Sequence, residues 1–175
     1  VCQVFCLAQA QAHLQSKQPW VIRGNLDCLG NFLDRPVEVP ALQCQLGAHR
    51  CVLADGERGR CRARLNVGGE LRSLTYGRPL AEHVDPIEKK PFFHFLPGSE
   101  AFSLGTAGCP LACRFCQNWE ISQAKPEDYP VEPRAAAAIA ERARARRAPV
   151  IAFTYNEPTV FGEYLTDIAR AARQQ

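Results

Sequence analysis

The chain has 175 residues, 46% of them hydrophobic, so it is long enough for one ordinary domain or two small ones. Its formal net charge is only +3, with 21 basic residues spread along the chain against 18 acidic ones, so no nucleic-acid partner is expected. No apolar stretch approaches the length of a membrane span and no secretory signal pattern is present, so no membrane partner is expected either.

The nine cysteines are a large and odd-numbered set for a chain of this length. Such a number is typical either of a secreted disulfide framework or of metal chemistry in a reducing compartment. The lack of a signal pattern and the close cysteine spacing described below both favour metal chemistry. We therefore predict a cytoplasmic protein.

Residues 1–43 show no clear pattern and are treated as an N-terminal extension of uncertain structure. Proline and glycine recur through its second half and interrupt any regular element. Its cysteines, Cys2, Cys6 and Cys28, lack the tight spacing of metal ligands, so we interpret them as buried or incidental thiols.

Residues 44–80 form a small unit with three cysteines, called the cysteine-bearing unit below. Gly68 and Gly69 mark a tight turn within it. The flanking segments Arg62–Val67 and Glu70–Tyr76 are therefore predicted to pair as a β-hairpin.

Residues 81–98 are predicted to be an irregular connector, because Pro86, Pro91 and Pro97 recur at short intervals. Each proline removes a backbone donor and restricts the residue before it. We therefore expect no continuous strand or helix in this segment.

The pattern changes at residue 99, and residues 99–175 are predicted to be the start of an α/β core. Ala101–Gly105 is a short strand candidate, and the alanine-rich stretch that ends at Ala148 has strong helix propensity. Val150–Tyr155 is an apolar run typical of a buried parallel strand, and an amphipathic helix follows it. Strand, helix, strand and helix in this order predict a parallel sheet.

Three cysteines follow the first of these strands at short spacing, at Cys109, Cys113 and Cys116, and residues 108–116 are called the cysteine loop below. Thiolates so close on one loop can converge on a single iron–sulfur cluster. When three cysteines hold a four-iron cluster, one iron has no protein ligand. Such an open position lets a metal centre engage a substrate.

Three other interpretations of the cysteine loop compete with a cluster. A structural zinc site closes with four ligands, and no further Cys or His follows Cys116 nearby, so zinc would need a distant ligand. A redox pair of Cys113 and Cys116 leaves Cys109 unexplained. Disulfide bonds cannot pair three cysteines. The cluster is therefore the preferred interpretation.

The Cys-x-x-x-Cys-x-x-Cys pattern after a first strand resembles the signature of the radical S-adenosylmethionine (SAM) superfamily, in which an aromatic residue such as Phe115 commonly precedes the third cysteine. Longer strings resemble one family within it, the radical SAM enzyme of the AmmeMemoRadiSam system, a relative of the pyruvate formate-lyase activating enzymes. These strings are DPIEKKPFFHFLPGS (85–99), FSLGTAGCPLACRFCQNWEISQ (102–123) and FTYNEPTVFGEYLTDIARAAR (153–173). The resemblance extends over about residues 44–173.

The resemblance implies that Cys109, Cys113 and Cys116 hold a [4Fe–4S] cluster whose open iron binds SAM. Reduction by a one-electron donor of the flavodoxin or ferredoxin type then cleaves SAM to methionine and a 5′-deoxyadenosyl radical, which abstracts hydrogen from an unidentified substrate. No residue is assigned as a catalytic acid, base or nucleophile.

The resemblance also implies that four further residues contact SAM. Phe115 matches a position near the adenine, although a core aromatic packed behind the loop is an equal alternative. Glu157 matches the place of a motif that contacts the SAM amino group, and its carboxylate could accept hydrogen bonds from an ammonium group. Thr154 and Asn156 offer further polar contacts. Asn156 and Glu157 could instead cap the next helix.

The cysteine-bearing unit resembles the N-terminal element of the same family, which is rich in cysteine and contains a histidine. Cys44, Cys51 and Cys61 are retained, with His49 in reach, and they could bind zinc or a second cluster. Gly47 stands where a further cysteine is expected. Because one ligand position is lost, we favour weakened or absent metal binding there.

These observations predict an α/β fold that forms the N-terminal part of a partial radical SAM β/α barrel, with about two βα units. A small cysteine-containing β-rich domain is expected to precede it in the chain. The chain contains no methionine and ends inside a helical pattern, so we expect an inactive fragment of a radical SAM oxidoreductase. Two alternatives stay open: a non-catalytic zinc-binding module and an inactive truncated product. AMMECR-like and MEMO-like proteins are expected partners by family analogy.

Overall fold

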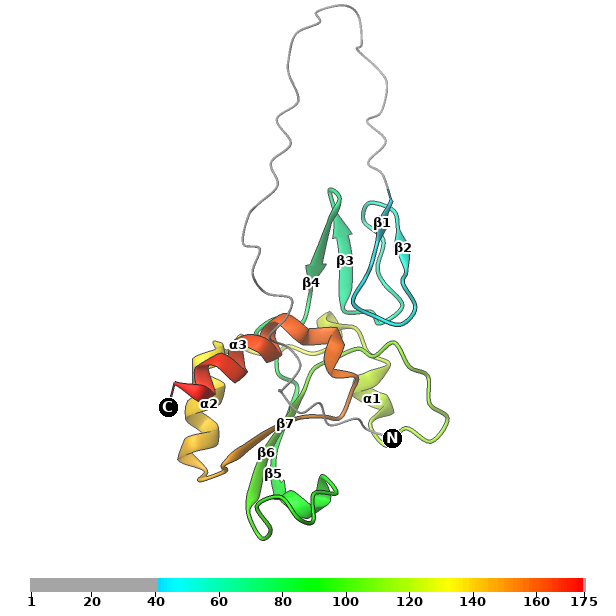
Figure 1. Cartoon of the computed structure of the whole chain (residues 1–175). Helices are drawn as coiled ribbons and strands as arrows, with labels where there is room; N and C mark the ends of the chain where they lie inside the picture. The colour runs from blue at the N-terminus through cyan, green and yellow to red at the C-terminus, as the bar shows by residue number, and fades with distance from the viewer. Residues whose placement is uncertain (1–40, 175) are drawn as a thin grey trace, which may run out of the picture. The chain divides into compact units, whose positions relative to one another are not determined.

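The computed structural model describes residues 41–174, all of which lie in the same compact unit (Figure 1). The N-terminal extension is predicted over residues 1–43, and its residues 1–40 lie outside the described residues. Cys2, Cys6 and Cys28 are among them.

The cysteine-bearing unit consists of short antiparallel strand pairs. The pairs are β1 (Leu42–Gln43) with β2 (Val52–Leu53), and β3 (Arg64–Val67) with β4 (Glu70–Ser73). Gly68 and Gly69 have φ angles of 61° and 84°, which a two-residue hairpin turn requires. The predicted hairpin is confirmed. Because β1 begins at Leu42, the cysteine-bearing unit is taken below as residues 42–80.

A second sheet forms the core and has the strand order β5–β6–β7. Its strands are β5 (Ala81–Pro86), β6 (Glu100–Gly105) and β7 (Val150–Phe153). β5 is antiparallel to β6, and β6 is parallel to β7. The predicted parallel pairing is therefore confirmed, and the described part of the chain has a mixed α/β structure.

The irregular connector predicted over residues 81–98 is wrong at its start. Ala81–Pro86 forms β5, and a short 3-10 helix, η2 (Ile87–Lys89), follows it. Pro86 is tolerated because it is the last residue of a strand at the edge of the described sheet, where a proline interrupts little of the ladder. A proline-rich segment can therefore contain a strand if its prolines fall at the strand end.

One face of this sheet packs against two helices, α2 (Ala136–Ala145) and α3 (Gly162–Arg173). Apolar side chains of β6 fill the space beneath the helices, and the apolar face predicted for the second helix is buried there. The buried residues of this core are Phe102, Leu104, Ile139, Ala143, Ala148, Tyr164 and Ile168.

The opposite face of the sheet carries small and polar side chains. The register places His83 and Asp85 of β5 on the same face as Ala101 and Ser103 of β6. Ala152 of β7 lies beside Ser103 on this face. Because these side chains are small or polar, residues 41–174 form only a small apolar cluster on this face, around Ile87, Ala101 and Ala152.

Three short elements complete the described chain. They are α1 (Trp119–Ser122), η3 (Pro126–Asp128) and η4 (Pro158–Phe161). No helix within residues 41–174 is long and apolar enough to cross a bilayer. The carboxyl ends of the parallel strands β6 and β7 meet at one edge of the sheet, and the segments that follow both strands come together there.

Candidate functional site

The cysteine loop is reached through two glycines at which a side chain would not fit. A Cβ atom on Gly105 would lie 2.6 Å from the carbonyl oxygen of Thr154, and one on Gly108 would lie 2.4 Å from the carbonyl oxygen of Cys61. Gly108 also has a φ angle of 87°, which other residues rarely adopt. The loop therefore passes closely between the end of β7 and the cysteine-bearing unit.

Asn156 fastens the start of the cysteine loop to the end of β7. Its buried side chain donates from Nδ2 to the carbonyl oxygen of Gly108 at 2.7 Å and to Thr106 Oγ1 at 3.2 Å. Its Oδ1 accepts from the backbone N–H of Thr106 at 3.3 Å. Both N–H donors of the amide are therefore used within the protein, and the carbonyl directly before Cys109 is fixed.

The three loop cysteines differ in exposure: Cys109 is 7% exposed, Cys116 is half-buried and Cys113 is exposed. Burial raises the pKa of the Cys109 thiol, although the backbone N–H groups of Leu111 and Glu157 donate hydrogen bonds to its sulfur and act in the opposite direction. Such hydrogen bonds stabilise a thiolate, which is the form that binds metal.

All three loop cysteines line one cavity, whose volume of about 430 Å³ is in the range of small-molecule and cofactor sites. The segment Thr154–Pro158 lines it as well, so the ends of both parallel strands contribute. Phe115 also borders the cavity, and its side chain is 80% exposed. Within the described residues, Phe115 is therefore not packed as a core aromatic behind the loop.

Glu157 and Thr154 both line this cavity. Glu157 caps η4 through a long contact, in which its Oε1 accepts from the backbone N–H of Thr159 at 3.4 Å. The capping alternative therefore applies weakly to Glu157, whereas the side chain of Asn156 binds the cysteine loop. The backbone N–H of Thr154 continues the sheet and donates to the carbonyl of Leu104 at 2.9 Å.

Within residues 41–174, no three side chains of His, Cys, Asp or Glu are grouped closely enough to hold a metal ion as they stand. The structure instead brings three thiols of one loop to the border of a shared cavity. Thiolates are the protein ligands of iron–sulfur clusters, so the donor set fits such a group.

Residues 103–175 match the family model of the radical SAM superfamily. This part of the chain is a radical SAM superfamily domain. It begins within β6 and includes the cysteine loop, the cavity-lining segment after β7 and both core helices. The predicted superfamily is thereby confirmed for residues 103–175.

Similarity to one curated relative covers more of the chain than the radical SAM domain does. Over 133 residues the chain is 40% identical to the uncharacterized protein MJ0808 of Methanocaldococcus jannaschii. The matched region is 76% of this chain and 40% of the relative, so the chain spans about two fifths of the length of the curated relative it matches. No solved structure shows significant similarity to the chain.

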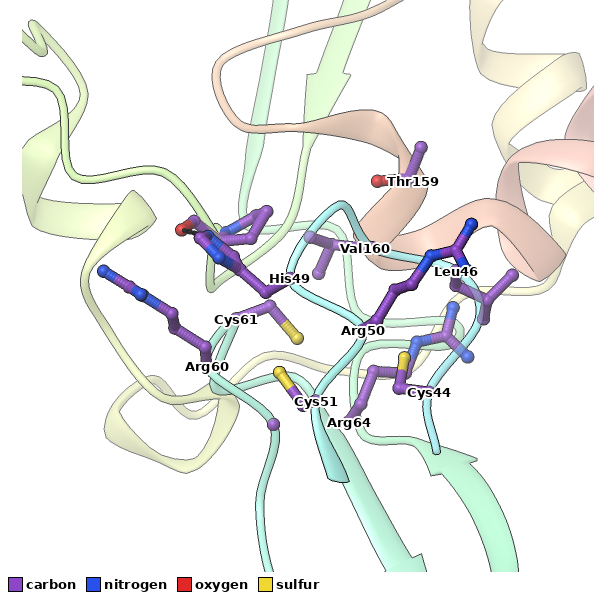
Figure 2. A pocket seen from close by; sticks show the side chains of 13 residues that line it. Cys44, Leu46, His49, Arg50, Cys51, Arg60, Cys61, Arg64, Thr159 and Val160 are labelled. Carbon is purple, nitrogen blue, oxygen red and sulfur yellow. Dashed lines mark hydrogen bonds between the residues drawn. The ribbon is translucent and has the colours of Figure 1, made fainter. Parts of the chain in front are cut away.

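A second and smaller cavity, of about 30 Å³, lies where the cysteine-bearing unit meets Pro110, Thr159 and Val160 of the radical SAM domain (Figure 2). Cys44, Cys51, Cys61 and His49 all line it, and so does Gly47. Figure 2 shows the side chains of Cys51 and Cys61 pointing toward one another. None of these three thiols is in a disulfide. The candidate ligands of a second metal therefore line one cavity, and weakened or absent metal binding there stays a prediction.

His49 makes a contact with the radical SAM domain. Its Nε2 lies 2.9 Å from the carbonyl oxygen of Pro110, the residue after Cys109. Because a carbonyl can only accept, Nε2 carries the proton and donates. A protonated ring nitrogen cannot ligate a metal, so this nitrogen serves the cysteine loop.

Tyr155 is a residue of the radical SAM domain that the sequence analysis did not single out. It lines the larger cavity, and its hydroxyl donates to Asp85 Oδ2 at 3.4 Å. Its φ angle of 72° is uncommon for a residue other than glycine and directs the chain away from β7. An apolar run that ends in tyrosine does not indicate a positive φ angle. Only the position of Tyr155 directly after a strand could have marked it as a candidate site residue.

Proposed function

We propose that Cys109, Cys113 and Cys116 bind a [4Fe–4S] cluster and that the cavity beside them receives SAM. Proteins of the radical SAM superfamily generally use both groups, and the match covers all three cysteines. The observation that carries the proposal is that the three thiols border one cofactor-sized cavity. Three thiolate ligands would leave one iron of a four-iron cluster without a protein ligand and so available to SAM.

With both groups bound, the chemistry supplied is reductive cleavage of SAM to methionine and a 5′-deoxyadenosyl radical, with the electron coming from a flavodoxin- or ferredoxin-type donor. The proposed role of the chain's own residues is to bind SAM and to orient it. We assign the SAM ammonium group to Glu157, whose carboxylate makes only the long capping contact at 3.4 Å among the described residues. The exposed ring of Phe115 is assigned to the adenine, and Thr154 to a further polar contact.

Asn156 is proposed to act mainly by holding the start of the cysteine loop in place. Both of its N–H donors are already used by Gly108 and Thr106, and its Oδ1 accepts one hydrogen bond. One lone pair of Oδ1 is left for a donor in the cavity. Any contact of Asn156 with SAM is therefore through that oxygen.

For the whole protein we propose a cytoplasmic radical SAM oxidoreductase of the AmmeMemoRadiSam kind, related to the pyruvate formate-lyase activating enzymes. The strings that extend from residue 85 to residue 173 support this assignment. Hydrogen abstraction is proposed for the whole protein, because the chain spans 40% of the matched relative. AMMECR-like and MEMO-like proteins are proposed as partners by family analogy alone.

The cluster is tested by anaerobic purification, reconstitution with iron and sulfide, and assay of iron, sulfide and zinc. We expect about four irons per chain in the unaltered protein. Cys113→Ala should lose most of this iron, and it should cost little folding stability because the thiol is exposed. Cys51→Ala is the matched control in the other cavity and should keep the iron. A colourless zinc protein, or iron that persists after all three loop cysteines are replaced by Ala, would refute the proposal.

The SAM assignment is tested on the reconstituted protein by electron paramagnetic resonance. Addition of SAM should change the spectrum of the reduced cluster, because SAM binds the open iron. Glu157→Gln should weaken this response at limiting SAM while the iron content stays unchanged, because a neutral amide attracts an ammonium group less than a carboxylate does. An unchanged SAM titration in Glu157→Gln would remove Glu157 from the site.

A further inference from the structure

One peptide group of the cysteine loop is held at both of its ends. The carbonyl of Pro110 accepts a hydrogen bond from His49 Nε2 at 2.9 Å. The N–H of the same peptide, which belongs to Leu111, faces the sulfur of Cys109 and acts to lower the pKa of that thiol. Pro110 is buried, so its carbonyl needs a donor, and His49 supplies it. A hydrogen bond from the cysteine-bearing unit thus reaches the peptide group whose N–H faces the Cys109 sulfur.

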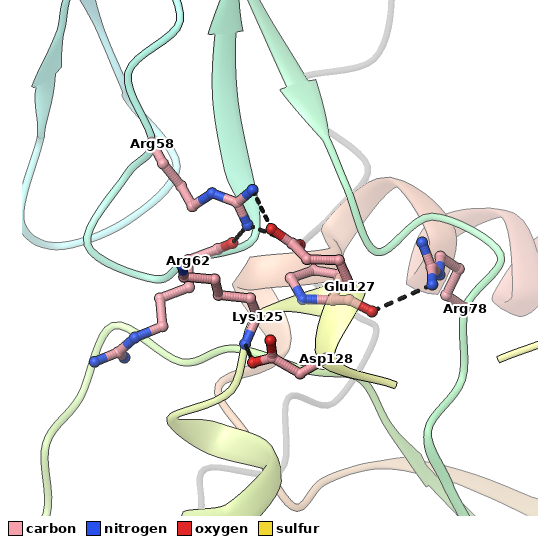
Figure 3. Close-up of polar contacts among 7 residues, drawn as sticks. Arg58, Arg62, Arg78, Lys125, Glu127 and Asp128 are labelled. Carbon is pink, nitrogen blue, oxygen red and sulfur yellow. Dashed lines mark hydrogen bonds and ion pairs between the residues drawn. The ribbon is translucent and has the colours of Figure 1, made fainter. Parts of the chain in front are cut away.

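The cysteine-bearing unit also reaches the next carbonyl of the loop. Gln123 donates from Nε2 to the carbonyl of Leu111 at 2.9 Å, and its Oε1 accepts from Arg62 Nη1 at 2.9 Å. The carbonyl of Arg62 accepts in turn from Arg58 Nη1 at 2.8 Å, and Arg58 also pairs with Glu127 (Figure 3). The two successive carbonyls after Cys109 are therefore both held from this unit, one directly and one through Gln123.

Close packing accompanies these hydrogen bonds on the other side of Cys109. A Cβ atom on Gly108 would lie 2.4 Å from the carbonyl oxygen of Cys61 and 3.2 Å from Cβ of Ala63, so the loop touches the cysteine-bearing unit before the cysteine as well as after it. The backbone on both sides of Cys109 is thus in contact with one unit of the chain.

We propose that His49 is a positioning residue that holds the Pro110–Leu111 peptide so that its N–H points at the Cys109 sulfur. The proposal rests on the proposed function, because the orientation of this sulfur matters for a cluster ligand. Hydrogen bonds in series polarise one another, so a donor on the carbonyl strengthens the N–H···S bond. Hydrogen bonds to cluster sulfurs help to set the reduction potential, and a donor favours the reduced state.

The experiment compares two variants of His49 in the full chain. His49→Phe keeps a ring of similar size but removes the donor, and His49→Gln places an amide N–H at a similar reach. His94→Phe is the matched control, because His94 is also exposed and lies outside the loop contacts described above. Two quantities are measured: amide hydrogen exchange at Leu111 in the metal-free chain, and the reduction midpoint of the chain reconstituted with iron and sulfide.

In the metal-free chain, His49→Phe should speed exchange at Leu111 roughly fivefold, which is what the loss of one net hydrogen bond is worth. In the reconstituted chain, His49→Phe should lower the reduction midpoint without changing the iron content. His49→Gln should restore much of both quantities, and His94→Phe should change neither. Recovery with His49→Gln separates positioning from a merely structural role, because restoring the hydrogen-bond donor would not repair a general loss of packing.

The proposal is overturned if either quantity is the same in His49→Phe and the unaltered chain, or if His94→Phe shifts them equally. His49 is exposed on its outer side, so both variants are expected to fold. If His49→Phe does not fold, His49→Ala takes its place against His49→Gln with the same outcomes. An unaltered chain that takes up no iron would refute the proposed function, while exchange at Leu111 in the metal-free chain would still decide the role of His49.

Discussion

The cysteine loop has little regular secondary structure, so its backbone groups depend on single side chains for their partners. Asn156 binds the carbonyl of Gly108 on one side of Cys109, and His49 binds the carbonyl of Pro110 on the other. The N–H groups of Leu111 and Glu157 reach the sulfur itself. Single residues from distant parts of the chain therefore decide where the buried thiol points, since an unpaired buried backbone group would be costly.

At this scale we predict that Asn156→Asp disturbs the site although the side chain keeps its size. Aspartate can still accept from the Thr106 N–H, but it loses both donors and leaves the Gly108 carbonyl without its partner. Chemical denaturation of the metal-free chain should show a loss of about 2 kcal/mol. Iron retention after reconstitution should fall as well.

Asn118→Asp is the control for this prediction, because Asn118 also lines the cavity but makes no side-chain cap hydrogen bond at α1. Its stability should change little. Equal stability of Asn156→Asp and the unaltered chain would contradict the positioning role of Asn156.

At the scale of elements, ion pairs hold strand β5 on both faces of the sheet. On the helix side, Glu82 pairs with Arg134 and Arg142, which lie before and within α2. On the opposite side, Asp85 pairs with Lys89 at 2.7 Å and with Lys90 at 2.8 Å. Lys90 is only 7% exposed, so its charge depends on this partner. An edge strand bonded on one side within the described sheet gains additional stability from such contacts.

We predict that Asp85→Asn destabilises the chain and removes part of its dependence on pH. Burial opposes ionisation of Asp85, but hydrogen bonds from Lys89 and Lys90 outweigh it and hold its pKa below the ordinary range. A carboxyl with a lowered folded-state pKa stabilises the fold above its unfolded pKa of about 4, and this contribution is lost as the pH falls toward the folded-state value. The variant should lose about 2 kcal/mol at neutral pH.

Urea unfolding at a series of pH values measures this effect. Asp85→Asn should show a flatter loss of stability below about pH 4 than the unaltered chain. Glu70→Gln is the control, because the side chains of Glu70 and Arg72 are 70% and 60% exposed and such a pair contributes little. Parallel curves for Asp85→Asn and the unaltered chain would contradict the prediction.

At the scale of the whole described chain, arginines of the cysteine-bearing unit connect it to the radical SAM domain. Arg64 of β3 is 2% exposed and binds Glu163, in the first turn of α3, through both of its Nη atoms. Arg78 donates to the carbonyls of Pro126 and Tyr129, each at 3.2 Å. These contacts bury charged groups that would be unpaired in either part alone, so we expect the two parts to unfold together.

Glu163→Gln tests this coupling. Burial opposes ionisation of Glu163, but its hydrogen bonds with Arg64 prevail and lower its pKa. The stability that the pair contributes is therefore present above the unfolded pKa, near 4, and is lost as the pH falls. Because the Glu163 side chain is 48% exposed, water screens the pair, and we expect a loss of about 1 kcal/mol at neutral pH. A single thermal transition should persist, and two separate transitions in the unaltered chain would contradict the coupling.

Signals that are local in the sequence were sufficient for several features. The spacing of Cys109, Cys113 and Cys116 indicated the superfamily that residues 103–175 match, and Gly68-Gly69 indicated the hairpin turn. The apolar run from Val150 predicted the strand that pairs in parallel with β6. These predictions succeed because spacing, turn chemistry and hydrophobic periodicity are set by neighbouring residues.

Only the tertiary structure decided which residues serve the cysteine loop. His49 and Pro110 are 61 residues apart in the chain, and Asn156 and Gly108 are 48 apart, so no local pattern joins them. Proline in residues 81–98 concealed β5, and the exposure of Phe115 could not be read from its place between cysteines. The sequence by itself predicted the chemistry of the loop and determined its superfamily match, because both depend on residue type and spacing. The fold determined how the Cys109 thiol is held, because that depends on donors and acceptors brought together across the chain.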